Sequence, residues 1–247
     1  MIQNNERIEL MRRAKDALDS ELIQLEEIYI ILYAISKIVT KNVHAETIVP
    51  IKKLIADEEV EIYERKLSTI DDNFVNELLG TLEKVQDKWR IYINRDIGSL
   101  TKRYVMAHEF SHYIINSIEM WDVNENCTNV LLPPNTREQM CDIMSSFLIL
   151  PFCTVVKLLR EYIDDQKKLY GNPIDLDEWI HYLGNEMGLK EYHTILCYQN
   201  VRYLAGALYR YKEEKNEKIE RILTDLNVDL EEEIQLIEKN PEFFRRR

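Results

Sequence analysis

The stretch His108–His112 is the part of this chain whose residue types and spacing allow metal chemistry. It reads His-Glu-x-x-His. Residues four apart in an α-helix lie on one face, so the imidazoles of His108 and His112 can share one zinc ion at about 2.0–2.1 Å. Glu109 projects in an adjacent direction and can accept a proton from a metal-bound water without being a ligand. The pattern predicts a metal site with a general base beside it.

The surrounding segment, Thr101–Ile118, has the length and apolarity of a buried helix. Apolar and aromatic residues occur around its whole circumference, which is typical of an interior helix. Two histidines hydrogen-bonded in a core would give the same pattern without a metal. Burying two imidazoles and a carboxylate without partners costs several kcal/mol, however, and a metal with its water would supply those partners.

A zinc ion in a catalytic site normally has three protein ligands and a water, so the motif predicts a third ligand elsewhere. Glu138 and Asp142 lie four residues apart on the next predicted helix, and Glu138 follows His112 by 26 residues. We predict Glu138 as the third ligand and Asp142 as the acceptor of the free N–H of a ligating histidine. Such a pair is often a solvated helix face, but the apolar run Ile143–Leu150 favours partial burial here.

Length and composition favour a globular protein with a substantial core. Of the 247 residues, 45% are hydrophobic and 31% charged, and the 6 Gly and 6 Pro favour helices with few long loops. The net charge of −12 argues against direct binding of nucleic acid, which requires clustered Lys and Arg. The cysteines form no Cys-x-x-Cys pair, the N-terminus is polar, and the apolar run Ile28–Ile35 is too short for a membrane span. We therefore expect a reduced, cytoplasmic protein.

Hydrophobic periodicity predicts helices on both sides of a short region of strands. The predicted elements before the motif are helices over Asn5–Lys41 and Ile48–Ala56, strands over Val60–Glu64 and Trp89–Asn94, and a candidate third strand over Glu77–Lys84. We expect these strands to form a small antiparallel or mixed sheet.

After the motif helix the sequence predicts a loop and then more helices. Asp122–Thr136 is polar and turn-rich, as the rim of a cleft would be, and Arg137–Leu150 is a helix stopped by Pro151. The chain from Phe152 onwards is helical, and the charged Lys212–Arg247 is interpreted as a surface helix.

Two stretches, in this order along the chain, resemble the ImmA/IrrE family of zinc metallopeptidases. Arg103–His112 is similar to the family's aromatic-x-x-Ala-His-Glu-x-Gly-His, and Ile91–Asn94 just upstream fits its Ile-x-Ile-Asn. Glu138–Pro151 looks like the family's Glu-x-x-Ala-Asn-x-Phe-Ala-Ala-x-Leu-Leu-Met-Pro, with the same distance between glutamate and proline.

The sequence also departs from this pattern. Ser111 replaces the usual glycine, Cys141 and Asp142 stand in place of Ala and Asn, and Met144 stands in place of an aromatic residue. None of these differences removes a proposed ligand or the proposed base.

The resemblance covers residues 44–151 and implies an α+β, mostly helical fold. The expected core, over residues 44–151, is a zincin-like minimal metallopeptidase with a small sheet before the motif helix. A helical segment over residues 1–43 precedes this core, and a helical region over residues 152–247 follows it. Within that last region, Asp175–Leu204 is loosely helix-turn-helix-like, although helix packing alone would give the same spacing. The family further implies one Zn²⁺ per chain, catalysis by Glu109, and a transcriptional repressor of helix-turn-helix type as the protein substrate.

Two other functions stay open at this point. The chain can be a zinc-dependent regulator that binds a repressor without cutting it, or a helical interaction protein in which the motif is accidental. His181 and His193 are further candidates for stabilising an oxyanion, although a lone histidine is more often structural.

Overall fold

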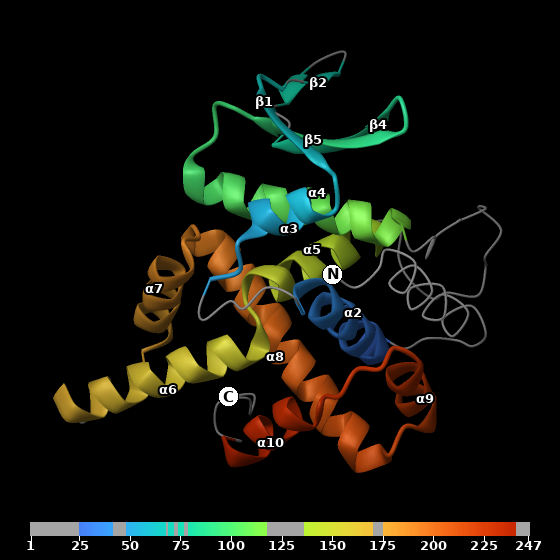
Figure 1. Cartoon of the computed structure of the whole chain (residues 1–247). Coiled ribbons are helices and arrows are strands. Elements are labelled where there is room, and N and C mark those ends of the chain that lie inside the picture. Colours follow the sequence, from blue (N-terminus) through green and yellow to red (C-terminus); the bar gives the residue numbers. More distant parts are fainter. Residues whose placement is uncertain are drawn as a thin grey trace.

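The computed structural model describes residues 25–41, 48–67, 69–71, 74–76, 79–117, 136–169 and 175–240. This part of the chain is mostly helical with a small mixed sheet, so the α+β class expected from the sequence is confirmed (Figure 1). Apart from Thr136, the predicted loop Asp122–Thr136 lies outside the described residues, as does the first part of the predicted helix Asn5–Lys41.

A three-stranded sheet lies over helix α4 (Ser99–Ser117), which carries the histidine motif (Figure 1). The central strand β5 (Lys88–Asn94) pairs in parallel with β1 (Glu61–Arg65) and antiparallel with β4 (Gly80–Val85). The mixed sheet and its third strand are therefore confirmed. β4 pairs with a neighbour on one side only, so its other edge is open as far as the described residues show.

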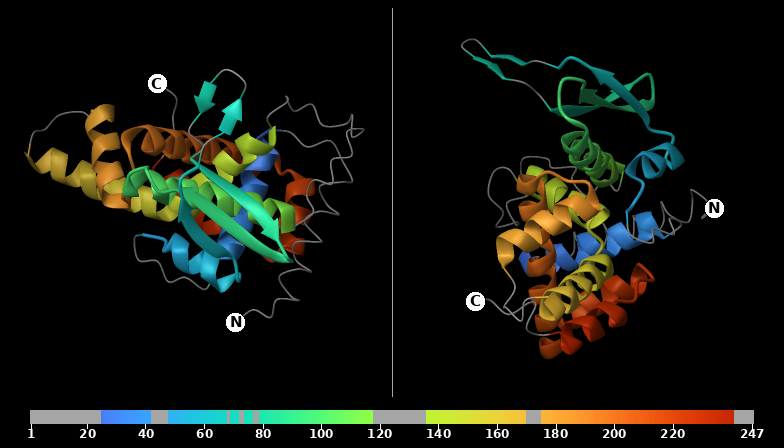
Figure 2. Two further views of the ribbon diagram at one scale, coloured as in Figure 1. Left: turned by 90° about the horizontal axis from the view of Figure 1, so that it is seen from above. Right: turned by 90° about the vertical axis from the view of Figure 1, so that its left-hand side faces the viewer.

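Two further strands, β2 (Thr69–Asp71) and β3 (Phe74–Asn76), form an antiparallel pair that the sequence analysis does not predict. They stand away from the three-stranded sheet and from the helices (Figure 2).

The outer face of the three-stranded sheet is covered by its own side chains. The Tyr63 and Tyr92 rings stack with centroids 5.6 Å apart, and the Arg65 guanidinium lies 3.6 Å from the Tyr92 centroid. Arg90 donates a 2.9 Å hydrogen bond to Glu61. Because these polar and aromatic groups pair with one another, this face can stay in water while the inner face packs on α4.

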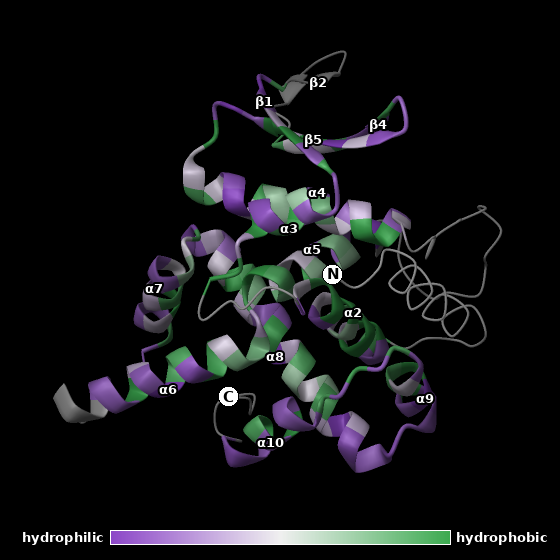
Figure 3. Ribbon diagram, viewed as in Figure 1, coloured by the Kyte–Doolittle hydropathy of each residue, from purple (hydrophilic) through white to green (hydrophobic). Residues whose placement is uncertain are grey.

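Three helices form the centre of the molecule beneath α4. They are α2 (Leu25–Thr40), α5 (Thr136–Ile149) and α8 (Glu191–Glu214), and they pack against one another, with α5 also against α4. Figure 3 shows hydrophobic residues concentrated on α2 and α5. The short α3 (Ile51–Asp57) follows Pro50 directly, so it begins three residues later than the predicted helix Ile48–Ala56.

The remaining helices surround this centre. They are α6 (Phe152–Leu169), α7 (Leu176–Met187), α9 (Glu217–Asp225) and α10 (Glu231–Lys239). The prediction of one surface helix over Lys212–Arg247 is wrong. Asn216 caps α9 with its side chain, and Asn227 adopts a positive φ of 53°, so the chain turns twice and buries the apolar sides of two short helices.

Buried polar contacts tie the last helix to α2. Glu233 accepts hydrogen bonds from Tyr33 at 2.9 Å and from Lys37 at 2.7 Å. Buried apolar residues from each of the three predicted segments belong to one hydrophobic cluster. The boundaries at residues 43 and 151 stay predictions.

Within the described residues, no single helix has the length and hydropathy of a membrane span, although α5 and α6 meet those criteria as a pair bent by 58°.

Candidate metal centre

Three potential ligand atoms form a nearly equilateral triangle between α4 and α5. His108 Nε2 lies 3.2 Å from His112 Nε2, and Glu138 Oε2 lies 3.3 Å from the first and 3.4 Å from the second. In a tetrahedral zinc site with metal–ligand distances of about 2.0–2.1 Å, neighbouring ligand atoms are about 3.3–3.4 Å apart. Two imidazoles and one carboxylate are also a donor set that zinc hydrolases use. These atoms therefore fit one zinc ion as they stand.

The triangle depends on the helix spacing and on one packing contact. The two histidines lie one turn apart on α4, and α5 packs along α4 so that Glu138, in its first turn, faces both of them. Met140 and Met144 on α5 are buried in the hydrophobic cluster of the core.

Asp142 lies one turn beyond Glu138 and contacts the far side of His108. Its Oδ1 is 2.9 Å from His108 Nδ1 and accepts a 2.7 Å hydrogen bond from the Tyr104 hydroxyl. This 2.9 Å contact is short, but its angles are not those of a hydrogen bond. His108 Nδ1 has no other hydrogen-bond partner among the described residues. A carboxylate at this position can orient the imidazole and leave Nε2 free for a metal.

The charge of Asp142 suits this orienting role. Burial favours its protonated form, but the contacts with His108 and Tyr104 outweigh burial and lower the pKa of Asp142. The same pairing works in the other direction for His108, whose pKa is lowered by burial and raised overall by Asp142. Burial and the neighbouring His108 together lower the pKa of His112.

Glu109 is almost fully buried between α4 and β4 and is not one of the three triangle residues. Burial raises the pKa of its carboxyl to about 7, with His108 lowering it and Glu138 raising it further. A carboxyl with a pKa near neutrality can take up and release a proton at the pH of a cell.

Gly80 allows β4 to approach the Glu109 carboxylate closely. A Cβ atom at Gly80 would lie 2.5 Å from Val105 Cγ1 and 2.9 Å from Glu109 Oε1. Both distances are shorter than real Cβ contacts, so a side chain here would displace Val105, Glu109 or the strand.

A cleft of about 720 Å³ joins these groups. Its lining comes from β4, α4, α5 and α8, and it includes the three triangle residues and Glu109.

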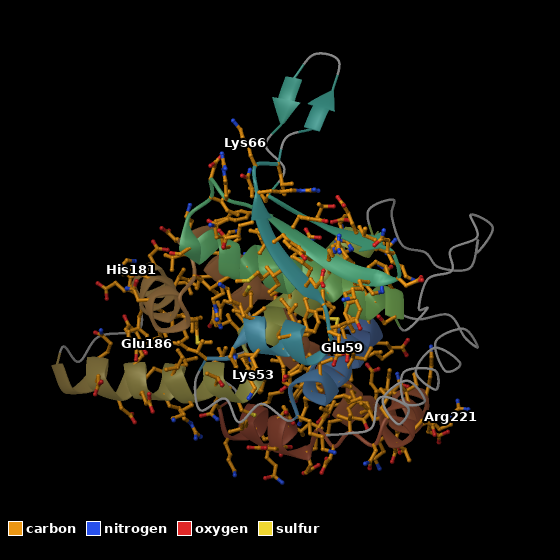
Figure 4. All side chains as sticks on the ribbon, turned by 45° about the horizontal axis from the view of Figure 1, so that its top comes forward. Lys53, Glu59, Lys66, His181, Glu186 and Arg221 are labelled. Atoms are coloured by element: carbon orange, nitrogen blue, oxygen red, sulfur yellow. The ribbon has the colours of Figure 1, made fainter. Side chains whose placement is uncertain are left out.

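The two further candidate histidines, His193 and His181, lie in different surroundings. His193, on α8, lines this cleft, and its ring stacks on Tyr104 with centroids 4.2 Å apart and planes 7° apart. Burial, with a smaller effect of Lys190, lowers the pKa of His193, which favours its neutral imidazole. His181 is exposed on α7 (Figure 4) and is not among the described residues that line the cleft.

Several residues around the site were not selected from the sequence. Tyr104 precedes His108 by one helical turn, so helix periodicity alone could have placed both side chains on the same face. Gly80 and the α8 residue Tyr192 had no such signal, because only folding brings β4 and α8 to the motif helix. Comparison with protein-family models, curated proteins and solved structures finds no match for this chain.

Proposed function

We propose that this protein is a zinc-dependent endopeptidase with a zincin-like core. The observation that carries the proposal is the triangle of His108, His112 and Glu138 donor atoms, with edges of 3.2–3.4 Å. The buried Glu109 beside it adds the proton acceptor that peptide hydrolysis requires. Among the described residues the group has three ligands, as a catalytic zinc site does, whereas a structural zinc site has four.

In this proposal His108, His112 and Glu138 hold the metal. Bound zinc supplies Lewis-acid activation of a water molecule and of the scissile carbonyl. Glu109 accepts a proton from the attacking water and passes it to the leaving amine nitrogen. Asp142, itself held by the Tyr104 hydroxyl, keeps the ring of His108 oriented.

The open edge of β4 suits a peptide substrate. Leu79–Leu82 line the cleft, and a strand with an open edge can pair with an extended peptide through backbone hydrogen bonds. The resemblance of residues 44–151 to the ImmA/IrrE family extends the proposal to a repressor of helix-turn-helix type as the substrate.

Metal removal tests the proposal. Protein purified without added metal is expected to contain about one zinc per chain and to cut members of a mixture of proteome-derived peptides, detected by mass spectrometry. A chelator should abolish cleavage, and added zinc should restore it. Cleavage that persists in zinc-free protein would contradict the proposal, and zinc binding without any cleavage would favour a regulator that binds without cutting.

Substitution of Gly80 by alanine is expected to lower kcat for a peptide from that mixture by about a hundredfold, since an error of about 1 Å in a catalytic group has effects of this size. The added Cβ would meet Glu109 Oε1 at 2.9 Å and move the carboxylate. The zinc content should stay at the wild-type value, because Glu109 is not one of the three proposed ligands.

Two further variants separate this effect from general misfolding. Gly98→Ala is a matched control, since a Cβ there meets no atom within 4 Å. In Gly80→Ala/Val105→Ala the closest contact, at 2.5 Å from Val105 Cγ1, is relieved while the contact with Glu109 stays. If the double variant regains wild-type kcat, Gly80 matters for packing and not for the position of Glu109.

A further inference from the structure

The first turns of α8 form one wall of the cleft. Helix α7 ends at Gly188, which has a left-handed φ of 63°, and α8 begins at Glu191. The buried Leu189 between them donates a 2.9 Å backbone hydrogen bond to Gly184. This tight connection places Tyr192 in the wall of the cleft that also contains the metal centre.

Three rings run along this wall towards the metal centre. The Tyr192 ring meets His193 edge-on with centroids 5.6 Å apart, and His193 stacks on Tyr104. Tyr104 is held in turn by its hydrogen bond to Asp142. The row of three rings therefore ends at Tyr104, one helical turn before His108. The hydroxyl of Tyr104 already donates its hydrogen bond to Asp142.

Large apolar side chains are exposed on both walls of this part of the cleft. Tyr192 on α8 is 73% exposed and Leu79, preceding β4, is 45% exposed. Leu196 and Leu82 lie deeper and are partly buried. These side chains come from different elements, since the sheet lies above α4 and α8 lies below it in Figure 1, and all four line the same cleft.

The cleft has a different character at its other end. There it is lined by Asn116 and Arg137, whose side chains hydrogen-bond to each other. Tyr104 and Asn116 are about 18 Å apart along α4, with the two histidines between them. An extended peptide of about five residues spans that length, so its side chains on the two sides of the metal centre meet different surroundings.

We infer that the space between Leu79 and Tyr192 is a specificity subsite for a large apolar side chain within about two residues of the scissile bond. This inference rests on the proposed peptidase function and adds the substrate class. The occupant is a side chain of the peptide itself, because the subsite is continuous with the proposed zinc ligands and with the open edge of β4. Substrates are then segments that carry Leu, Met or an aromatic residue at this point.

Hydroxamates test the subsite without requiring catalysis. The zinc-loaded full chain is titrated calorimetrically with N-acetyl-leucine hydroxamate and with N-acetyl-aspartate hydroxamate, which share the metal-chelating group. Leucine is expected to bind about tenfold to a hundredfold more tightly, as burial of its side chain implies. Equal affinity of the two probes would overturn the inference.

Paired surface variants locate the effect. Tyr192→Ser/Leu79→Ser should reduce the preference for leucine to near equality while leaving the zinc content unchanged. The matched control, Tyr209→Ser/Leu176→Ser, removes residues that are 53% and 54% exposed and are not among the described cleft-lining residues, and it should keep the full preference. A preference that survives in the first variant would also overturn the inference.

The two proposals fail separately. Cleavage of the peptide mixture without any preference for apolar residues would overturn the subsite and keep the peptidase. The expected hydroxamate preference with no peptide cut would overturn the peptidase and leave the subsite as a ligand-binding site.

Discussion

Replacing Glu109 with glutamine is expected to lower kcat/KM for peptide cleavage by about a thousandfold or more while zinc stays bound. Glutamine preserves the shape of the side chain but cannot accept the proton of the attacking water. The His108, His112 and Glu138 donor atoms are untouched, so the zinc content should equal that of the wild type. The measurement is cleavage of a peptide identified in the mixture, together with metal analysis of the same sample.

Although it lowers activity, the same variant is expected to raise the stability of the metal-free protein. The carboxyl of Glu109 has a pKa of about 7 in the folded chain and near 4.5 when unfolded. Between these values the folded state binds the extra proton, so this group lowers stability as the pH rises from 4.5 to 7. Glutamine has no such penalty, and we expect Glu109→Gln to be more stable than the wild type above pH 7, by up to about 3 kcal/mol.

Urea unfolding of both metal-free proteins at pH 5 and pH 8 measures this difference. The stability gain should be small at pH 5 and largest at pH 8. A variant that is less stable than the wild type at both values would show that the Glu109 carboxylate stabilises the fold, and wild-type cleavage by the variant would remove Glu109 from the proposed mechanism.

Loss of the Glu138 carboxylate is expected to weaken zinc binding by more than a hundredfold. Groups that only orient a ligand contribute about tenfold to a hundredfold to metal affinity, and a ligand itself contributes more. In Glu138→Ala the two Nε2 atoms 3.2 Å apart would be the remaining protein donors of the triangle. Competition with a chromophoric chelator gives the affinity.

The neighbouring Gln139→Ala is the matched control, since Gln139 is exposed on the same turn of α5 and is not part of the triangle. Asp142→Asn should have an intermediate effect, because Asp142 contacts His108 without belonging to the triangle. If Glu138→Ala binds zinc as tightly as the wild type, a different group completes the site.

Local patterns in the sequence were sufficient for the elements that carry the motif. The spacing of His108 and His112 depends only on helix geometry. Helix α4 begins two residues before the predicted Thr101 and continues to Ser117, the last described residue of this segment. Alternation in Trp89–Asn94 predicted β5 for a similar reason, because side chains on a strand repeat every two residues. The candidate strand Glu77–Lys84 rested on its leucines around Gly80, and it overlaps β4. The single helix over Lys212–Arg247 was the clearest error, since apolar spacing continues across two turns that the asparagines at 216 and 227 introduce.

The role of Glu138 could be predicted in part from local sequence and depends in part on tertiary structure. Its distance of four residues from Asp142 predicted that both lie on one helix face, and the need of a catalytic zinc ion for a third ligand selected the pair. That Glu138 Oε2 lies within 3.4 Å of both histidine nitrogens depends on how α5 packs along α4. The sequence alone could not predict this distance.

The substrate side of the cleft was decided by tertiary structure alone. Gly80 matters because β4 crosses α4 at Glu109, and Tyr192 and His193 matter because α8 packs beneath α5 and reaches the same cleft. None of these residues has a neighbour in the sequence that indicates its role. The spacing along one helix determined the pair of histidines and the adjacent base, whereas burial of apolar surface among α2, α4, α5 and α8 determined what surrounds them.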